Sequence, residues 1–162
     1  MMSMKHTIAV LVNDQPGVLQ RVAGLFGRRG FNIESITVGQ SEEEGLSRMV
    51  IVTTGDDTTL EQIEKQLYKL IDVIKVINLS LKPMVARELA LIKVKAEPSA
   101  RPEVLGVVET FRESVVDIGA SSLMVQVVGD TGKIDAMIEL LKPYGIQELT
   151  RTGATAMIRG NA

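Results

Sequence analysis

The chain has 162 residues, of which 45% are hydrophobic, so it can bury one modest core or two small ones. Its 18 Lys and Arg residues nearly balance its 20 Asp and Glu residues, no block of like charge occurs, and 3% of residues are aromatic. This composition argues against a nucleic-acid-binding surface. The lack of cysteine excludes disulfides, thiolate metal sites and thiol catalysis, and is typical of a reducing compartment.

The N-terminal sequence carries neither a membrane segment nor a cleavage signal. The apolar run that follows His6 becomes polar again by Asn13, which is too short a distance to span a membrane. No small-residue cleavage pattern accompanies it. We therefore expect a cytoplasmic protein with no membrane contact.

The first half of the chain alternates strand and helix signals. Residues 8–12 are apolar and rich in β-branched side chains, which predicts a buried strand, and residues 13–17 predict a turn. Apolar residues at helical spacing then continue as far as Gly30, a residue typical of a helix C-terminus. Two strands, 31–40 and 46–54, are expected on either side of a polar hairpin loop.

One more helix and one more strand complete this half. Asp57 or Thr58 can cap the helix, whose apolar stripe starts at Leu60, and residues 73–81 predict the last strand. The resulting order is strand, helix, strand, strand, helix, strand. This is the order of a ferredoxin-like fold, in which both helices cover one face of an antiparallel sheet.

After Pro83 the same order of elements begins again. Residues 98–102 predict a helix entry, because proline is tolerated in a first turn, and Asp130 or Thr131 predicts the cap of a second helix. The expected strands are residues 89–96, 115–118, 123–128 and a final strand from 146 that breaks near Gly153 and resumes at 154–158. We therefore predict an α+β fold of two tandem ferredoxin-like βαββαβ domains, residues 1–82 and 83–162.

The first predicted sheet has apolar residues on both faces. Val10 alternates with Ala9 and Leu11, and all three are apolar. An antiparallel sheet in water normally has one polar face, so this sheet needs a second cover. The second domain or another copy of the chain can provide it, and some exposed apolar surface on a small domain is the alternative.

The residues give little support to catalysis. His6 is the only histidine, and in a chain without cysteine it forms neither a metal cluster nor a nucleophile pair. The acidic run Glu42-Glu43-Glu44 lies in a predicted loop, where a solvated turn is favoured over a cation site. Gly24 and Gly27 lie inside a predicted helix and not at its start, so they do not form a dinucleotide-binding loop. We expect no catalytic and no metal-binding residues.

The turn after the first strand is the best candidate for a binding site. Pro16 fits an early helical position, Gly17 allows a ligand to approach the main chain, and N–H groups at a helix start attract a carboxylate. The ammonium of an amino acid needs acceptors, which Asp14, main-chain carbonyls or the amide of Asn32 can supply. A turn that is merely architectural, with Asn32 capping its own backbone, explains the same spacing equally well.

Two strings in the first half carry a family resemblance. Asn13-Asp14-Gln15-Pro16-Gly17-Val18-Leu19 and Arg28-Arg29-Gly30-Phe31-Asn32-Ile33-Glu34-Ser35 resemble the ACT domains of acetolactate (acetohydroxyacid) synthase small subunits. The likeness continues through residues 46–49, 60–67, 87–94, 145–146 and Arg151-Thr152-Gly153. It covers nearly the whole chain, and the string Arg-Gly-Phe-Asn-Ile-Glu-Ser is far more specific than a general ACT-domain match.

The resemblance implies a non-catalytic regulatory subunit whose first domain, residues 1–82, is an ACT effector-binding domain. Small subunits of this family raise the activity of the thiamine-diphosphate catalytic subunit that opens branched-chain amino-acid biosynthesis. They also confer feedback inhibition, commonly by valine held between two ACT domains of a homodimer. Thiamine diphosphate, magnesium and FAD are expected in the large catalytic partner, and no cofactor in this chain. The second domain, residues 83–162, would help to dimerise and to transmit the signal.

Carried over by motif, the effector-binding positions are Asp14, Gly17, Val18, Leu19, Asn32 and Ile33. Many relatives have asparagine where this chain has Asp14. A carboxylate there would strengthen ammonium binding or repel the ligand carboxylate, and the sequence leaves both open. An ACT-domain amino-acid sensor that controls a different enzyme is the alternative function, and a small enzyme on the same scaffold is a third for which no residues are found.

Overall fold

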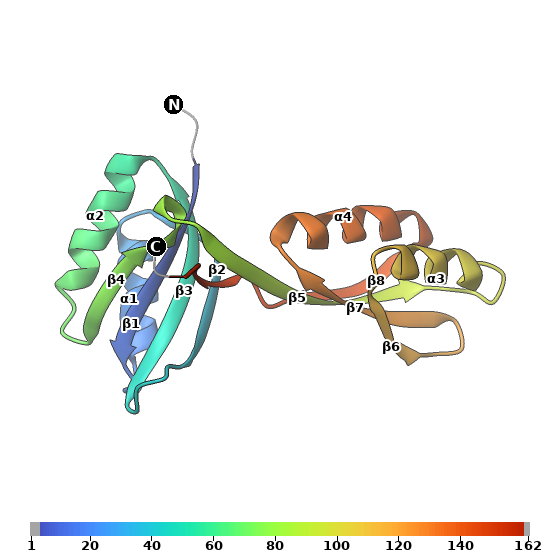
Figure 1. The fold of residues 1–162 in the computed structure, drawn as a ribbon, viewed down its shortest axis with the longest axis horizontal. Helices are drawn as coiled ribbons and strands as arrows, with labels where there is room; N and C mark the ends of the chain where they lie inside the picture. Colours follow the sequence, from blue (N-terminus) through green and yellow to red (C-terminus); the bar gives the residue numbers. More distant parts are fainter. Residues whose placement is uncertain (1–3, 161–162) are drawn as a thin grey trace. The chain divides into compact units, whose positions relative to one another are not determined.

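Residues 4–160 are described by the computed structural model and fall into two units (Figure 1). The first unit contains the chain up to Val85 together with the C-terminal segment from Gly153, and the second unit is Ala86–Thr152. Among residues 4–160, no helix is both long enough and apolar enough to cross a membrane.

The first unit has two helices on one face of a four-stranded antiparallel sheet with the strand order β2-β3-β1-β4 (Figure 1). Its elements are β1 (Met4–Asn13), α1 (Val18–Arg28), β2 (Asn32–Gln40), β3 (Leu46–Gly55), α2 (Asp57–Tyr68), β4 (Val73–Asn78) and the short 3-10 helix η1 (Leu79–Leu81). Alternate residues of β1, such as Val10, meet the apolar stripes of both helices in the core. Asp56 caps α2, not Asp57 or Thr58, because its carboxylate accepts a hydrogen bond from the Thr59 N–H at 2.7 Å.

The second unit repeats this arrangement, with strand order β6-β7-β5-β8. Its elements are β5 (Met84–Lys95), α3 (Arg101–Thr110), β6 (Ser114–Ile118), β7 (Ser122–Gly129), α4 (Thr131–Leu141), the 3-10 helix η2 (Lys142–Tyr144) and β8 (Ile146–Arg151). Pro102 lies in the first turn of α3. Asp130 caps α4 by accepting from the Lys133 N–H at 2.9 Å. The predicted α+β fold of two ferredoxin-like units is thereby confirmed.

The C-terminal segment belongs to the first unit, whereas the predicted division between residues 82 and 83 put it in the second domain. The last strand, β9 (Thr155–Ile158), pairs with β5, contacts β1 and η1, and belongs to the first unit. The Arg159 N–H donates to the Pro83 carbonyl at 2.9 Å, which fixes its end. The segment packs on the first unit because this buries two of its alanines: Ala154 and Ala156 are only 8% and 7% exposed there.

This segment also answers the question of the two-sided apolar sheet. Ala9 and Val50 pair across β1 and β3 on the face away from the helices, and each is 2% exposed. Leu79 of η1, also 2% exposed, and the segment containing β9 lie against this sheet. Part of the second cover therefore comes from η1 of the predicted first domain, and part from β9, which lies in the segment predicted as the second domain.

Candidate functional site

The turn between β1 and α1 is held by main-chain hydrogen bonds from two sides. The Asp14 N–H donates to the Gly45 carbonyl at 2.8 Å, and the Asn13 N–H donates to the Asp72 carbonyl at 2.9 Å. Gly17 is the residue before α1 and has φ of 84°, a left-handed conformation that strongly favours glycine. The exposed Asp14 side chain is therefore carried by a fixed backbone.

The start of α1 is open to an anion. Gly17 has no side chain to cap the helix, and by helix geometry the N–H groups of Leu19 and Gln20 have no intrahelical acceptor. Val18 is 3% exposed and anchors the helix in the core, whereas Leu19 is 44% exposed beside the turn. The predicted residues Gly17, Val18 and Leu19 thus place a helix start, which favours negative charge, beside an exposed apolar side chain.

The positively charged side chain of Arg21 lies beside this helix start. Arg21 was not among the site residues predicted from the sequence. Arg21 donates from Nη2 to Oδ2 of Asp72 at 2.5 Å, and a Cβ added at Gly17 would lie 3.2 Å from its Nη1. The Arg21 side chain is 49% exposed. Arg21 follows Gly17 by four residues, about one helical turn, and this spacing could have indicated from the sequence that it lies near the helix start.

Asn32 and Ile33 begin β2, and they lie far from this turn. Asn32 has an exposed side chain, and its carbonyl accepts a hydrogen bond from the Thr53 hydroxyl at 2.5 Å. Ile33 is partly buried against the core. A β-bulge follows, since the register of β2 against β3 shifts between Ile33 and Ser35.

The register of the sheet separates the two groups of predicted residues. Asn13 pairs with Leu46 at one end of β3, and Asn32 pairs with Thr54 at the other. At the usual rise of a strand, these ends are about 26 Å apart. One chain therefore brings Asp14, Gly17, Val18 and Leu19 together but does not bring Asn32 and Ile33 to them.

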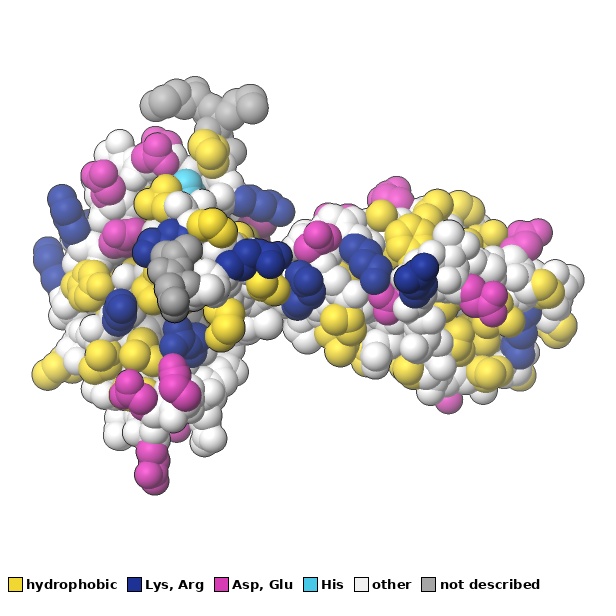
Figure 2. Space-filling view, in the orientation of Figure 1, with side chains coloured by type: hydrophobic (Ala, Val, Ile, Leu, Met, Phe, Trp, Pro, Cys, Tyr) yellow, Lys and Arg dark blue, Asp and Glu magenta, His cyan; other side chains and the backbone are white. Residues whose placement is uncertain are grey.

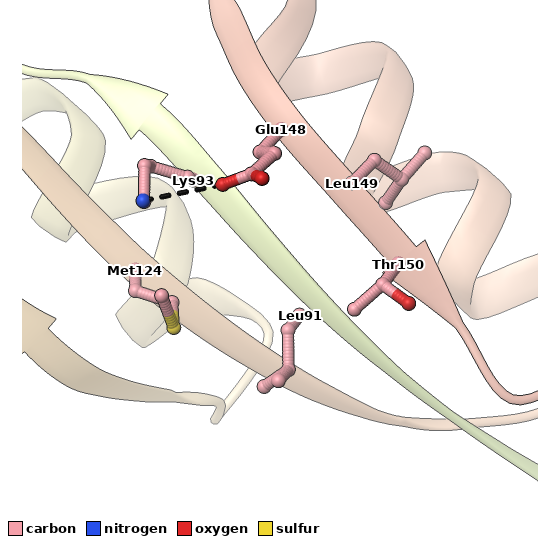
Figure 3. Close-up of a pocket in the computed structure, with 6 residues that line it drawn as sticks. All are labelled: Leu91, Lys93, Met124, Glu148, Leu149 and Thr150. Atoms are coloured by element: carbon pink, nitrogen blue, oxygen red, sulfur yellow. Dashed lines mark ion pairs between the residues drawn. The ribbon is translucent and has the colours of Figure 1, made fainter.

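Two hollows lie on sheet faces without helices, and neither includes a predicted residue. One, of about 440 Å³, is lined by residues of β2, β3 and β9, among them Thr37, Val50 and Met157. The other, of about 200 Å³, lies on the second sheet, where Lys93 pairs with Glu148 at 3.2 Å beside Leu91 and Met124 (Figure 3).

The charged side chains of the described residues do not gather into a metal-binding group. Basic and acidic groups are interspersed over the face shown in Figure 2. Within residues 4–160, no three His, Asp or Glu side chains gather where a metal ion could be held.

His6 is 5% exposed, with Nε2 3.0 Å from the Gly55 carbonyl oxygen. Backbone hydrogen bonding and Arg48, 2.9 Å away, hold the pKa of Glu42 below its ordinary value.

Comparison with known families gives two adjacent matches. Residues 8–75 match the family model described as the AHAS small subunit-like ACT domain, and residues 87–160 match the model described as the small subunit of acetolactate synthase. Together the two matches span both units.

Individual relatives cover the chain almost end to end. A probable acetolactate synthase small subunit from Archaeoglobus fulgidus is 55% identical over 98% of this chain and 99% of its own length. The acetolactate synthase small subunit of Bacillus subtilis is 52% identical, with 97% and 92% covered. The crystal structure of the Thermotoga maritima acetolactate synthase small subunit is 46% identical, covers 98% of this chain and 99% of its own, and superposes with a TM-score of 0.89.

Proposed function

The chain belongs to the family of acetolactate synthase small subunits, and from this premise we propose that it is a cytoplasmic regulatory subunit that responds to a branched-chain amino acid. In this proposal it activates the large catalytic subunit and confers feedback inhibition by valine. Thiamine diphosphate, magnesium and FAD would be held by that partner, and this chain would contribute no catalytic group.

The observation that carries the proposal is the separation of Asn32 from the turn at Gly17. Strand β2 is an edge of its sheet, so its outer side is available for pairing. If two copies pair their β2 strands antiparallel about a two-fold axis, Asn32 of one copy faces the Gln40 end of the other. That end also carries the turn, because the Asp14 N–H bonds to Gly45 beside the start of β3.

A site completed in this way matches the chemistry of an amino acid. The helix start and Arg21 provide N–H groups and positive charge for the carboxylate. The amide oxygen of Asn32 from the second copy, and the Asp14 carboxylate, are acceptors for the ammonium. Leu19 and Ile33 offer apolar surface to a branched side chain. The six predicted positions then act together as one site shared by two chains.

Inhibition follows from this arrangement by linkage. An effector that bridges two chains favours one mutual arrangement of them, and it alters catalysis only if the large subunit distinguishes that arrangement from the empty one. A coupling free energy of about 1–3 kcal/mol is typical of such regulation.

The test uses the complex of this chain with its large subunit. Asn32→Ala should weaken valine binding in calorimetry and raise the valine concentration for half-inhibition, while activation of the large subunit persists. Gln62→Ala, which removes an exposed amide from α2, is the matched control and should leave both unchanged. Loss of activation with unchanged valine sensitivity would refute the role of Asn32. Failure to copurify with a thiamine-diphosphate enzyme would favour a sensor for a different enzyme.

A further inference from the structure

The junction of Thr152 and Gly153 is where the chain leaves the second unit and re-enters the first. Gly153 has φ of 80°, a conformation that L side chains rarely adopt. A Cβ added here would lie 2.6 Å from the Cβ of Ser35 on β2 and 3.0 Å from its Oγ. Glycine therefore packs directly against β2 at Ser35, where a larger residue would have to displace the strand.

Ser35 is adjacent to the residues that we assign to the effector. The bulge in β2 lies between Ile33 and Ser35, and Asn32 immediately precedes it. A bulge leaves a residue unpaired and breaks the regular ladder, so this part of an edge strand can shift more easily than its neighbours. A displacement of Asn32 or Ile33 on binding would reach Ser35 within three residues.

On the other side of the junction, the chain is fixed to the second unit. The Thr152 N–H donates to the Leu89 carbonyl at 3.0 Å, and the Leu89 N–H donates to the Thr152 hydroxyl at 3.1 Å. Arg151 binds Glu88, a residue only 5% exposed, through hydrogen bonds of 2.6 and 3.1 Å, and it also binds Asp135 at 2.8 Å. Residues 151 and 152 therefore cannot move without moving the start of β5 in that unit.

Beyond Gly153, the chain is fixed to the first unit. Ala154 and Ala156 are buried there, and the Arg159 N–H is bonded to Pro83. Each flank of the junction is therefore held within its own unit.

We propose that the packing of Ser35 on Gly153 transmits effector binding at β2 to the second unit. Long-range coupling needs a physical element that both sites bias, and this contact touches the effector strand and is covalently joined to the Arg151 anchor. The inference rests on the proposed function for the place of the effector, but the transmitting contact has its own test.

The test is hydrogen exchange of the full chain, with and without valine, followed by inhibition of the holoenzyme. In the natural chain, valine should slow exchange in β2 and also in β5 and β8. In Gly153→Ala, β2 should still respond, but the response in β5 and β8 should fall by about tenfold, together with valine inhibition of the holoenzyme. Ser35→Gly added to Gly153→Ala should restore both in part, because it vacates the space that the new methyl group needs while the backbone strain at residue 153 remains.

The matched control is Gly160→Ala in the same C-terminal segment. Gly160 also has a positive φ, of 53°, but a Cβ there meets nothing within 4 Å, so this variant should behave like the natural chain. If Gly153→Ala does not fold, Ser35→Thr places the extra methyl on the other side of the same contact and should give the same loss.

Failure of the proposed effector and failure of the proposed transmitting contact give different results. If the natural chain does not respond to valine at all, the proposed effector is wrong. The Ser35–Gly153 contact is then tested in the chain without effector. There Gly153→Ala should raise hydrogen exchange in both β2 and β8, and a change in only one of these strands would refute the role of the contact. If valine still slows exchange in β5 and β8 of Gly153→Ala as in the natural chain, the inference is overturned.

Discussion

Arg151 donates two hydrogen bonds to Glu88, whose side chain is 4% exposed. These hydrogen bonds hold the pKa of Arg151 above its ordinary value, so the guanidinium stays charged. Removing one member of a buried ion pair leaves an uncompensated charge in the interior.

Arg151→Met should therefore lower the free energy of unfolding by about 3 kcal/mol, near the low end for buried pairs because the guanidinium keeps some exposure. Urea denaturation measures this. Glu88→Gln combined with Arg151→Met should recover most of the loss. Lys142→Met removes one member of an exposed pair with Glu139 and should change the free energy by less than about 0.5 kcal/mol. Equal losses in the buried and exposed cases would contradict the assignment.

The ion pair of Arg21 with Asp72 predicts two opposite effects on the effector. Arg21→Gln removes a cation from the helix start and should weaken valine binding by about fivefold. Asp72→Asn removes the competing anion and should strengthen binding by a similar factor, since the main-chain bond from Asn13 to Asp72 remains. Calorimetry at low and high salt measures both, and the two differences should shrink in high salt. Effects of the same sign would show that Arg21 acts only through folding.

Much of the fold could be predicted because the deciding signals are local. The apolar β-branched run around Val10 and the glycine at Gly30 are local features, and they predicted the inner part of β1 and the end of α1. The strand itself begins earlier, at Met4. The cap of α2 was placed one or two residues late, because Asp56, Asp57 and Thr58 are all chemically able to cap, and only the geometry of the first turn selects Asp56.

What could not be predicted depends on partners that are distant in sequence. The return of β9 to the first unit depends on bonds such as that from Arg159 to Pro83, which no local pattern indicates. In the candidate site, the turn was found from Pro16 and Gly17. The spacing of Arg21 from Gly17 was a local signal, but its ion pair with Asp72, 51 residues further along the chain, was not.

The cap of α2 predicts a dependence of stability on acid. The hydrogen bond from the Thr59 N–H holds the pKa of Asp56 below its ordinary value. The carboxylate form is therefore favoured by folding, and its contribution is complete above the ordinary Asp pKa of about 3.9 and is lost as the pH falls through the lower folded pKa. Asp56→Asn keeps an acceptor but cannot titrate. The difference in melting temperature between it and the natural chain should shrink below about pH 4, and a constant difference would be inconsistent with titration of Asp56.

The proposed dimer predicts that the two edges of the first sheet respond differently to charge. Val38 on β2 and Ile74 on β4 are 47% and 50% exposed, so lysine at either position fits the isolated unit. If two copies pair through β2, Val38→Lys puts two like charges close to one seam and opposes association. Sedimentation velocity should then show Val38→Lys as a monomer, with weak or no valine binding, while Ile74→Lys remains a dimer and binds normally. Dissociation by Ile74→Lys alone would move the seam to β4, where Asn32 could not reach a second copy's Gly17, and the shared effector site would have to be abandoned.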